Sequence, residues 1–187
     1  MAELADLLPR LAAWMQKYMT SFYTEDKNIQ QAILIKQEHT GCVRKISREL
    51  AEHLSLEAHD AVLAEIMGLL HDVGRFRQFT LYQTFNDALS EDHAALGLKV
   101  LQEQLLLEKM AAADRELLYF AIQNHNKKVI APTQDSRALL FARLLRDADK
   151  LDIYRVLKPD GNIPREENLA PGLLADLQRG RLSDYRC

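Results

Sequence analysis

The side chains in this 187-residue chain that are best suited to chemistry are imidazoles and carboxylates on the apolar faces of predicted helices. Apolar helix faces point toward the core. A buried imidazole or carboxylate without a partner is costly, so such groups are generally hydrogen-bonded or bound to metal. Because these residues come from separate helices, the sequence predicts that they converge on a metal site. They are His39, His71, Asp72, His93, His125 and Asp149.

A series of amphipathic helices is predicted to position these residues. His39 lies in the middle of one helical face, between Ile35 and Val43 at i, i+4 and i+8. His71 continues the buried face of the next helix, and Gly74 is the expected stop after it. His93 opens a later helix and His125 closes another. The predicted helices cover about 4–20, 28–54, 56–72, 90–108, 115–125 and 136–156, so an all-α fold is expected.

Two stretches have a weaker helical pattern, at 75–89 and 158–172. The first is rich in aromatic residues, and the second holds Pro159, Gly161, Pro164, Pro171 and Gly172. Connections this long are more often functional than accidental. They are expected to form the pocket walls, or else to pack against the outside of the helices.

A His-Asp pair alone is weak evidence, and the chain contains an internal control in His59-Asp60. This pair falls in the first turn of its predicted helix, where the helix dipole favours an acidic residue. It is therefore expected to be solvated surface. His71-Asp72 differs because it continues a buried helical face.

Composition narrows the class of protein. The chain is 48% hydrophobic with 7 Gly and 5 Pro, which favours a single helical domain. Its net charge of −3 argues against DNA or RNA as a partner. Cys42 and Cys187 are too few for a thiolate zinc site or a disulfide framework. No signal peptide and no membrane-spanning stretch is expected, so a cytoplasmic location is the default prediction.

Five stretches, KQEHTGCV, GLLHDVGRF, DHAALG, QNHNK and RDADKLD, together resemble the HD superfamily of metal-dependent phosphohydrolases. They occur in the order of that superfamily and span about 36–152. The HDVGR form is most similar to the HDIG group, with Arg75 where many members have Lys. The resemblance implies a single HD domain over 1–187, with its metal site in a central cleft. Its core motif region would be 28–157, with an N-terminal helix at 4–20 and a C-terminal extension at 158–187.

The resemblance also implies the ligands. His39, His71, Asp72 and Asp149 match the residues that hold a first metal. His93 and His125 match the extra ligands of members with two metals, in which Asp72 is expected to bridge. Alternatively, His93 and His125 bind substrate phosphate or water around a single metal. Nitrogen and oxygen ligands suit Mn, Fe, Ni, Co, Zn or, less well, Mg.

The implied activity is hydrolysis of a phosphomonoester or phosphodiester by water that a divalent metal activates. Asp72, His93 and His125 are the expected catalytic residues. The expected substrate is a small phosphorylated molecule, with nucleotides among the candidates. The basic residues next to the ligands are expected to neutralise its phosphate, and these are Arg75, Lys127, Lys128 and Lys150.

Two other functions stay open on the sequence alone. Six-ligand HD sites also occur in diiron oxygenases, which would replace hydrolysis by oxidative cleavage. A non-catalytic nucleotide-binding module would keep the fold without turnover. The complete set of six expected ligands argues against the second alternative.

Overall fold

Helices form the structure throughout the part of the chain that the computed structural model describes, which is residues 4–157, with side chains up to residue 153. This range has no strand, which confirms the all-α prediction. The helices are α1 (Leu4–Thr20), α2 (Lys27–His53), α3 (Ala58–Leu70), α4 (Val73–Tyr82), the 3-10 helix η1 (Asp87–Leu89), α5 (His93–Glu103), α6 (Ala112–Asn124) and α7 (Ser136–Leu157).

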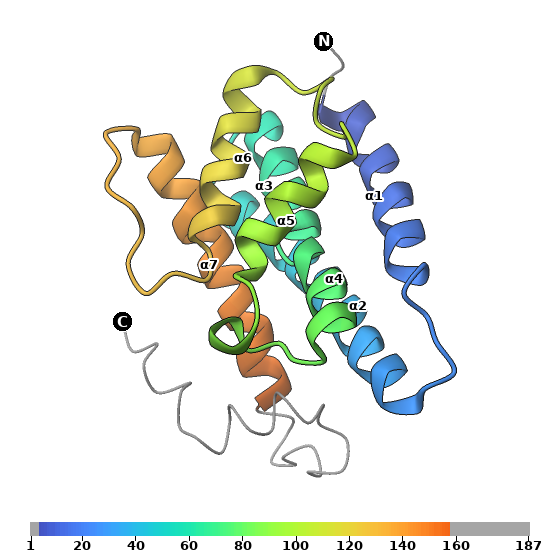
Figure 1. Cartoon of the computed structure of the whole chain (residues 1–187). Coiled ribbons are helices and arrows are strands. Elements are labelled where there is room, and N and C mark those ends of the chain that lie inside the picture. Colours follow the sequence, from blue (N-terminus) through green and yellow to red (C-terminus); the bar gives the residue numbers. More distant parts are fainter. Residues whose placement is uncertain (1–3, 158–187) are drawn as a thin grey trace.

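Helix α3 is the centre of the bundle (Figure 1). It contacts α1, α2, α6 and α7. Every residue from Ile66 to Leu70 is buried, whereas an amphipathic helix buries a single stripe. A helix that is apolar on all sides is stable only inside a protein. The burial of α3 therefore places its C-terminal end, where His71-Asp72 follows, inside the molecule.

Helices α2 and α3 approach each other closely at Gly68. A Cβ atom on Gly68 would lie 2.5 Å from the Ser47 hydroxyl oxygen and 2.8 Å from the carbonyl oxygen of Val43. The absence of a side chain at Gly68 therefore allows the two backbones into contact. His39 of α2 and His71 after α3 meet about one helical turn further along this antiparallel pair.

The predicted irregular stretch at 75–89 is wrong in its first half, because residues Val73–Tyr82 form α4. The prediction that Gly74 ends a helix is also wrong. The chain turns at His71 and Asp72, and Gly74 lies inside the next helix. The pattern was hard to detect because α4 is only 10 residues long and buries the polar Gln78 together with Phe76 and Phe79.

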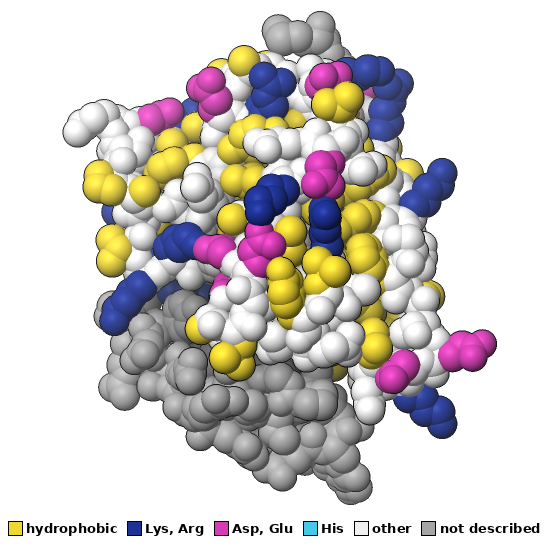
Figure 2. All heavy atoms as spheres, in the orientation of Figure 1, with side chains coloured by type: hydrophobic (Ala, Val, Ile, Leu, Met, Phe, Trp, Pro, Cys, Tyr) yellow, Lys and Arg dark blue, Asp and Glu magenta, His cyan; other side chains and the backbone are white. Residues whose placement is uncertain are grey.

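Other boundaries differ by a few residues. Helix α5 ends at Glu103, and α6 begins at Ala112, before Asp114. The stretch at 158–172, and the whole predicted extension at 158–187, lie outside the described residues. Among the helices within 4–157, none is both long and apolar enough to cross a membrane. On the face shown in Figure 2, several acidic and basic side chains lie next to one another. Hydrophobic side chains are exposed on the same face.

Candidate metal centre

The carboxylate of Asp72 has a different pair of histidines at each of its oxygens. Its Oδ2 atom lies 3.6 Å from Nε2 of His39 and 3.7 Å from Nε2 of His71. Its Oδ1 atom lies 3.4 Å from Nε2 of His93 and 3.7 Å from Nε2 of His125. Asp72 and the four histidines are all buried. The site therefore has two halves that share one carboxylate.

In the first half, His39 from α2 and His71 from the end of α3 meet Asp149 from α7. The Nε2 atoms of His39 and His71 are 3.3 Å apart. Oδ1 of Asp149 lies 3.0 Å from Nε2 of His39 and 3.7 Å from Nε2 of His71. The Asp149 side chain is 20% exposed, whereas that of Asp72 is 3% exposed. The first half of the site is therefore open to solvent at Asp149.

In the second half, His93 from the start of α5 meets His125 from the end of α6. Their Nε2 atoms are 3.0 Å apart. Asp92 caps α5 by accepting hydrogen bonds from the backbone N–H groups of Ala94 and Ala95, which holds His93 at the first position of the helix. The structure thus brings together all six residues of the predicted ligand set.

Each of the four histidines has an oxygen acceptor at its other ring nitrogen, Nδ1. A hydrogen bond to an oxygen places the proton on Nδ1 and leaves the lone pair on Nε2. All four lone pairs are then directed toward Asp72. The acceptors are Asp152 for His39, the Gly68 carbonyl for His71, Asp87 for His93 and the Ile122 carbonyl for His125, at 2.7, 2.8, 2.7 and 2.6 Å.

This donor set fits one or two divalent cations. Lone pairs that face each other at 3.0 and 3.3 Å repel unless a cation lies between them. Neighbouring ligands at about 2.1 Å from one metal ion are about 3 Å apart when they subtend a right angle. Three-residue groups that could hold an ion include His39, His71 and Asp72 in the first half and Asp72, His93 and His125 in the second.

The electrostatics of the site keep its carboxylates ionised. Burial alone would raise the pKa of Asp72, but Lys36 and His71 hold it well below the ordinary value. Burial also acts to raise the pKa of Asp149, but the neighbouring imidazoles of His39 and His71 hold it well below the ordinary value. Ionised carboxylates are the form that binds metal.

The histidine pKa values are shifted in opposite directions. Burial lowers the pKa of His71. Burial, together with the charge of Arg75, lowers the pKa of His93 to about 3. Burial and Lys36 also act to lower the pKa of His39, but Asp149 and Asp152 outweigh them and the pKa is raised. Burial therefore favours the neutral imidazole at His71 and His93, and His39 is the more easily protonated.

Two residues at the site were not singled out from the sequence. Lys36 lies one helical turn before His39, and its ammonium nitrogen is 2.8 Å from Oδ2 of Asp72. Asp87 accepts hydrogen bonds from His93, Arg75 and other donors on neighbouring segments. The spacing of Lys36 from His39 was a usable signal, since residues three apart share a helix face. For Asp87, the first residue of the three-residue helix η1, no periodic signal exists.

The four basic residues expected to contact phosphate lie in different surroundings. Arg75 reaches the site, with Nε 3.5 Å from Oδ1 of Asp72, and its Nη1 donates to Asp87. Lys127 forms an ion pair with Asp92. Lys128 is exposed, and Lys150 is half-buried on α7. Arg75 thus contacts a residue of the ligand set, Asp72.

The prediction that His59-Asp60 is solvated surface needs correction. The His59 side chain is 51% exposed, yet its Nε2 lies 3.0 Å from Oδ2 of the buried Asp114. Asp60 forms an ion pair with Arg137 of α7. The pair therefore links the N-terminal ends of α3, α6 and α7. It lies at the opposite end of α3 from His71, about 18 Å away along a helix.

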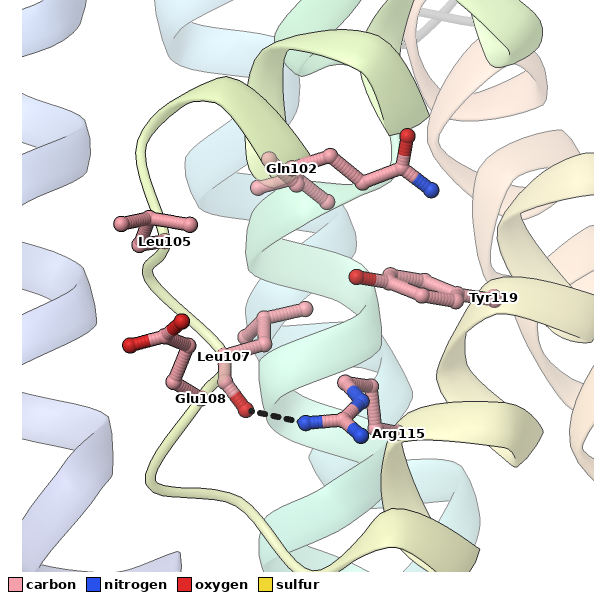
Figure 3. A pocket seen from close by; sticks show the side chains of 7 residues that line it. Gln102, Leu105, Leu107, Glu108, Arg115 and Tyr119 are labelled. Atoms are coloured by element: carbon pink, nitrogen blue, oxygen red, sulfur yellow. Dashed lines mark hydrogen bonds between the residues drawn. The ribbon is translucent and has the colours of Figure 1, made fainter.

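A separate hollow lies at the other ends of the two helices that carry His93 and His125 (Figure 3). In Figure 3 the Nη1 atom of Arg115 donates to the carbonyl oxygen of Leu107 at 3.4 Å. The hollow therefore lies apart from the metal centre. Its lining is Leu101, Gln102, Leu105, Leu107, Glu108, Arg115 and Tyr119.

Comparison with known proteins agrees with this geometry. The family model described as HD domain matches residues 37–154, and the chain belongs to this family. A search of curated proteins found no match, and a search of solved structures found none either. Family membership and the clustered imidazoles and carboxylates together indicate a metal-dependent hydrolase.

Proposed function

We propose that the chain is a metal-dependent phosphohydrolase that cleaves a phosphomonoester or phosphodiester of a small metabolite or nucleotide. The observation that carries the proposal is the sharing of Asp72 between two histidine pairs, one at each carboxylate oxygen. Two cations a few ångströms apart are the arrangement that holds both the attacking and the leaving oxygen of a phosphoester.

Each half of the site would hold one cation. His39, His71, Asp72 and Asp149 would hold one cation, and Asp72, His93 and His125 a second. Cations held there would act as Lewis acids and lower the pKa of a water molecule toward neutrality. The hydrogen bonds at the four Nδ1 atoms keep the Nε2 lone pairs directed inward, which fixes the site before substrate arrives.

Among the four basic residues expected to contact phosphate, Arg75 is the best placed to donate a hydrogen bond to a substrate oxygen. Its Nε is buried and has no hydrogen-bond partner. A buried N–H group without an acceptor is costly, and a phosphate oxygen is a suitable acceptor. Lys127, Lys128 and Lys150 remain candidates for the rim of the site, where charge attracts an anionic substrate.

The test is a hydrolysis assay on aryl phosphate, bis-aryl phosphate, nucleotide and sugar-phosphate substrates, repeated with each candidate metal. Phosphate or alcohol release is expected with at least one metal and is expected to fall to background in Asp72→Asn. The matched control is Asp147→Asn, which alters an exposed carboxylate on the helix that carries Asp149. Turnover with iron that requires oxygen would identify an oxygenase instead. Tight nucleotide binding without turnover would identify a binding module.

A further inference from the structure

Lys36 brings a positive charge directly to the shared carboxylate. Its ammonium nitrogen lies 2.8 Å from Oδ2 of Asp72, and its side chain is 19% exposed. That oxygen is also the one that faces His39 and His71. Lys36 is therefore both within reach of the metal ligands and close to solvent, where a substrate would enter.

Oδ2 of Asp72 cannot bind the Lys36 ammonium group and a divalent cation equally well at the same time. A cation held by this oxygen would repel the ammonium group and draw on the same lone pairs. The ammonium group is a compact charge on a flexible stem of four carbons, so it can move to another anion at small cost. Its hydrogen bonds then need a new acceptor beside the metal ligands.

The ring of Phe85 would keep Lys36 near the site when this contact is lost. The Lys36 ammonium lies 5.5 Å from the ring centroid, within the range of a cation–π contact. The guanidinium carbon of Arg75 lies 5.9 Å from the same centroid. Phe79 packs against the ring with centroids 4.5 Å apart, which holds Phe85 in place.

Lys36 therefore lies at Oδ2 of Asp72 and Arg75 at Oδ1. Both cationic groups also lie near the ring of Phe85. We infer that Lys36 is a substrate-binding residue whose ammonium group donates to a phosphate oxygen when Asp72 holds a divalent cation. The inference rests on the proposed phosphohydrolase function. It adds a positively charged phosphate contact that comes from α2, opposite the contact from Arg75 of α4.

Inorganic phosphate is the probe, titrated by calorimetry into protein loaded with Mn²⁺, with metal content measured on each sample. Lys36→Gln is expected to weaken phosphate binding by about tenfold or more, since a hydrogen bond to a charged group is lost. Its metal content should equal or exceed that of wild type, because a competing cation has been removed from Asp72. Lys36→Met, which keeps the stem over Phe85, should behave alike, and Lys36→Arg should recover part of the affinity.

The matched control is Lys45→Gln on the same helix, where the side chain is 78% exposed and pairs with Glu49. It should bind phosphate as wild type does. Unchanged phosphate binding in Lys36→Gln or Lys36→Met would overturn the role of Lys36 and leave the hydrolase proposal standing. Loss of metal in parallel with loss of phosphate would show a structural role and also overturn the inference. Wild type that holds metal and binds no phosphate would overturn both proposals.

Discussion

Gly74 of α4 and Gly97 of α5 lie directly against each other where the two helices cross. A Cβ atom on Gly74 would stand 2.2 Å from the carbonyl oxygen of His93 and 2.6 Å from the backbone nitrogen of Gly97. Asp72 lies two residues before Gly74, and His93 begins α5. This backbone contact therefore sets how closely the His93 imidazole approaches the Asp72 carboxylate.

Gly74→Ala is expected to separate α4 from α5 and to weaken the second half of the site. Overpacking costs about 1–3 kcal/mol, from which the better helix propensity of Ala recovers at most about 1 kcal/mol. Denaturant unfolding and metal content would measure both effects. Gly41→Ala is the control, since its Cβ would have no neighbour within 4 Å. The control should keep or raise stability, and equal effects of the two substitutions would contradict the packing account.

Chelation should lower the melting temperature of the wild-type protein. A ligand present at a hundredfold excess over its Kd stabilises the folded state by about 2.7 kcal/mol, or roughly 5–10 °C for a domain of this size. Asp72→Ala, which removes the carboxylate that both halves of the site share, should melt at the same temperature with and without chelator. His59→Ala should lose some stability through its contact with Asp114, yet keep the full response to chelator. A wild type that ignores chelator would contradict a tight metal site.

Metal should be lost in acid, beginning in the first half of the site. Metal binding requires neutral imidazoles. The pKa of His39 is raised, whereas that of His93 is lowered to about 3, so His39 takes up a proton first as the pH falls. Because the bound cation competes with that proton, loss is expected below about pH 6. The loss of metal is measured as metal content after gel filtration at a series of pH values. Full retention of metal at about pH 4 would rule out a histidine site.

Asp87→Asn should weaken the second half of the site while leaving the first half intact. The Asp87 carboxylate accepts from Nδ1 of His93 at 2.7 Å and from Nη1 of Arg75 at 2.9 Å. Loss of such a partner generally costs about 10–100-fold in metal affinity or activity. Metal titration would show one weakened and one unchanged binding event. Asp147→Asn, on an exposed face of α7, should change neither event.

The fold class followed from the sequence because helical periodicity is repeated along the chain. His39 and His71 stood out because each interrupts an apolar face with a polar group, and their clustering in space agrees with that reading. The all-α fold is confirmed, and the six expected ligand residues converge within the described range. Local pattern was sufficient where the site residue lies inside or at the end of a helix whose apolar residues are clear in the sequence.

The remaining features depend on tertiary contacts that leave little local signal. Helix α4 is short, and Gly74 resembles a stop although its role is close packing against α5. Asp87 gains its importance from donors on other segments, including His93 and Asn126. His59 likewise has the sequence pattern of a surface residue, and its contact with Asp114 of α6 depends on the tertiary structure. Partners distant in sequence cannot be assigned from periodicity.

The number of metal ions per chain tests the central proposal, that Asp72 is shared by two cations. Elemental analysis of wild type saturated with Mn²⁺ or Fe²⁺ should give about two ions per chain, the two-metal arrangement, and His93→Ala or His125→Ala should give about one with the fold retained. Anomalous scattering from a crystal grown in excess metal should show two peaks beside Asp72. One ion per chain in wild type, unchanged in both variants, would contradict the shared-carboxylate account and reassign His93 and His125 to phosphate binding.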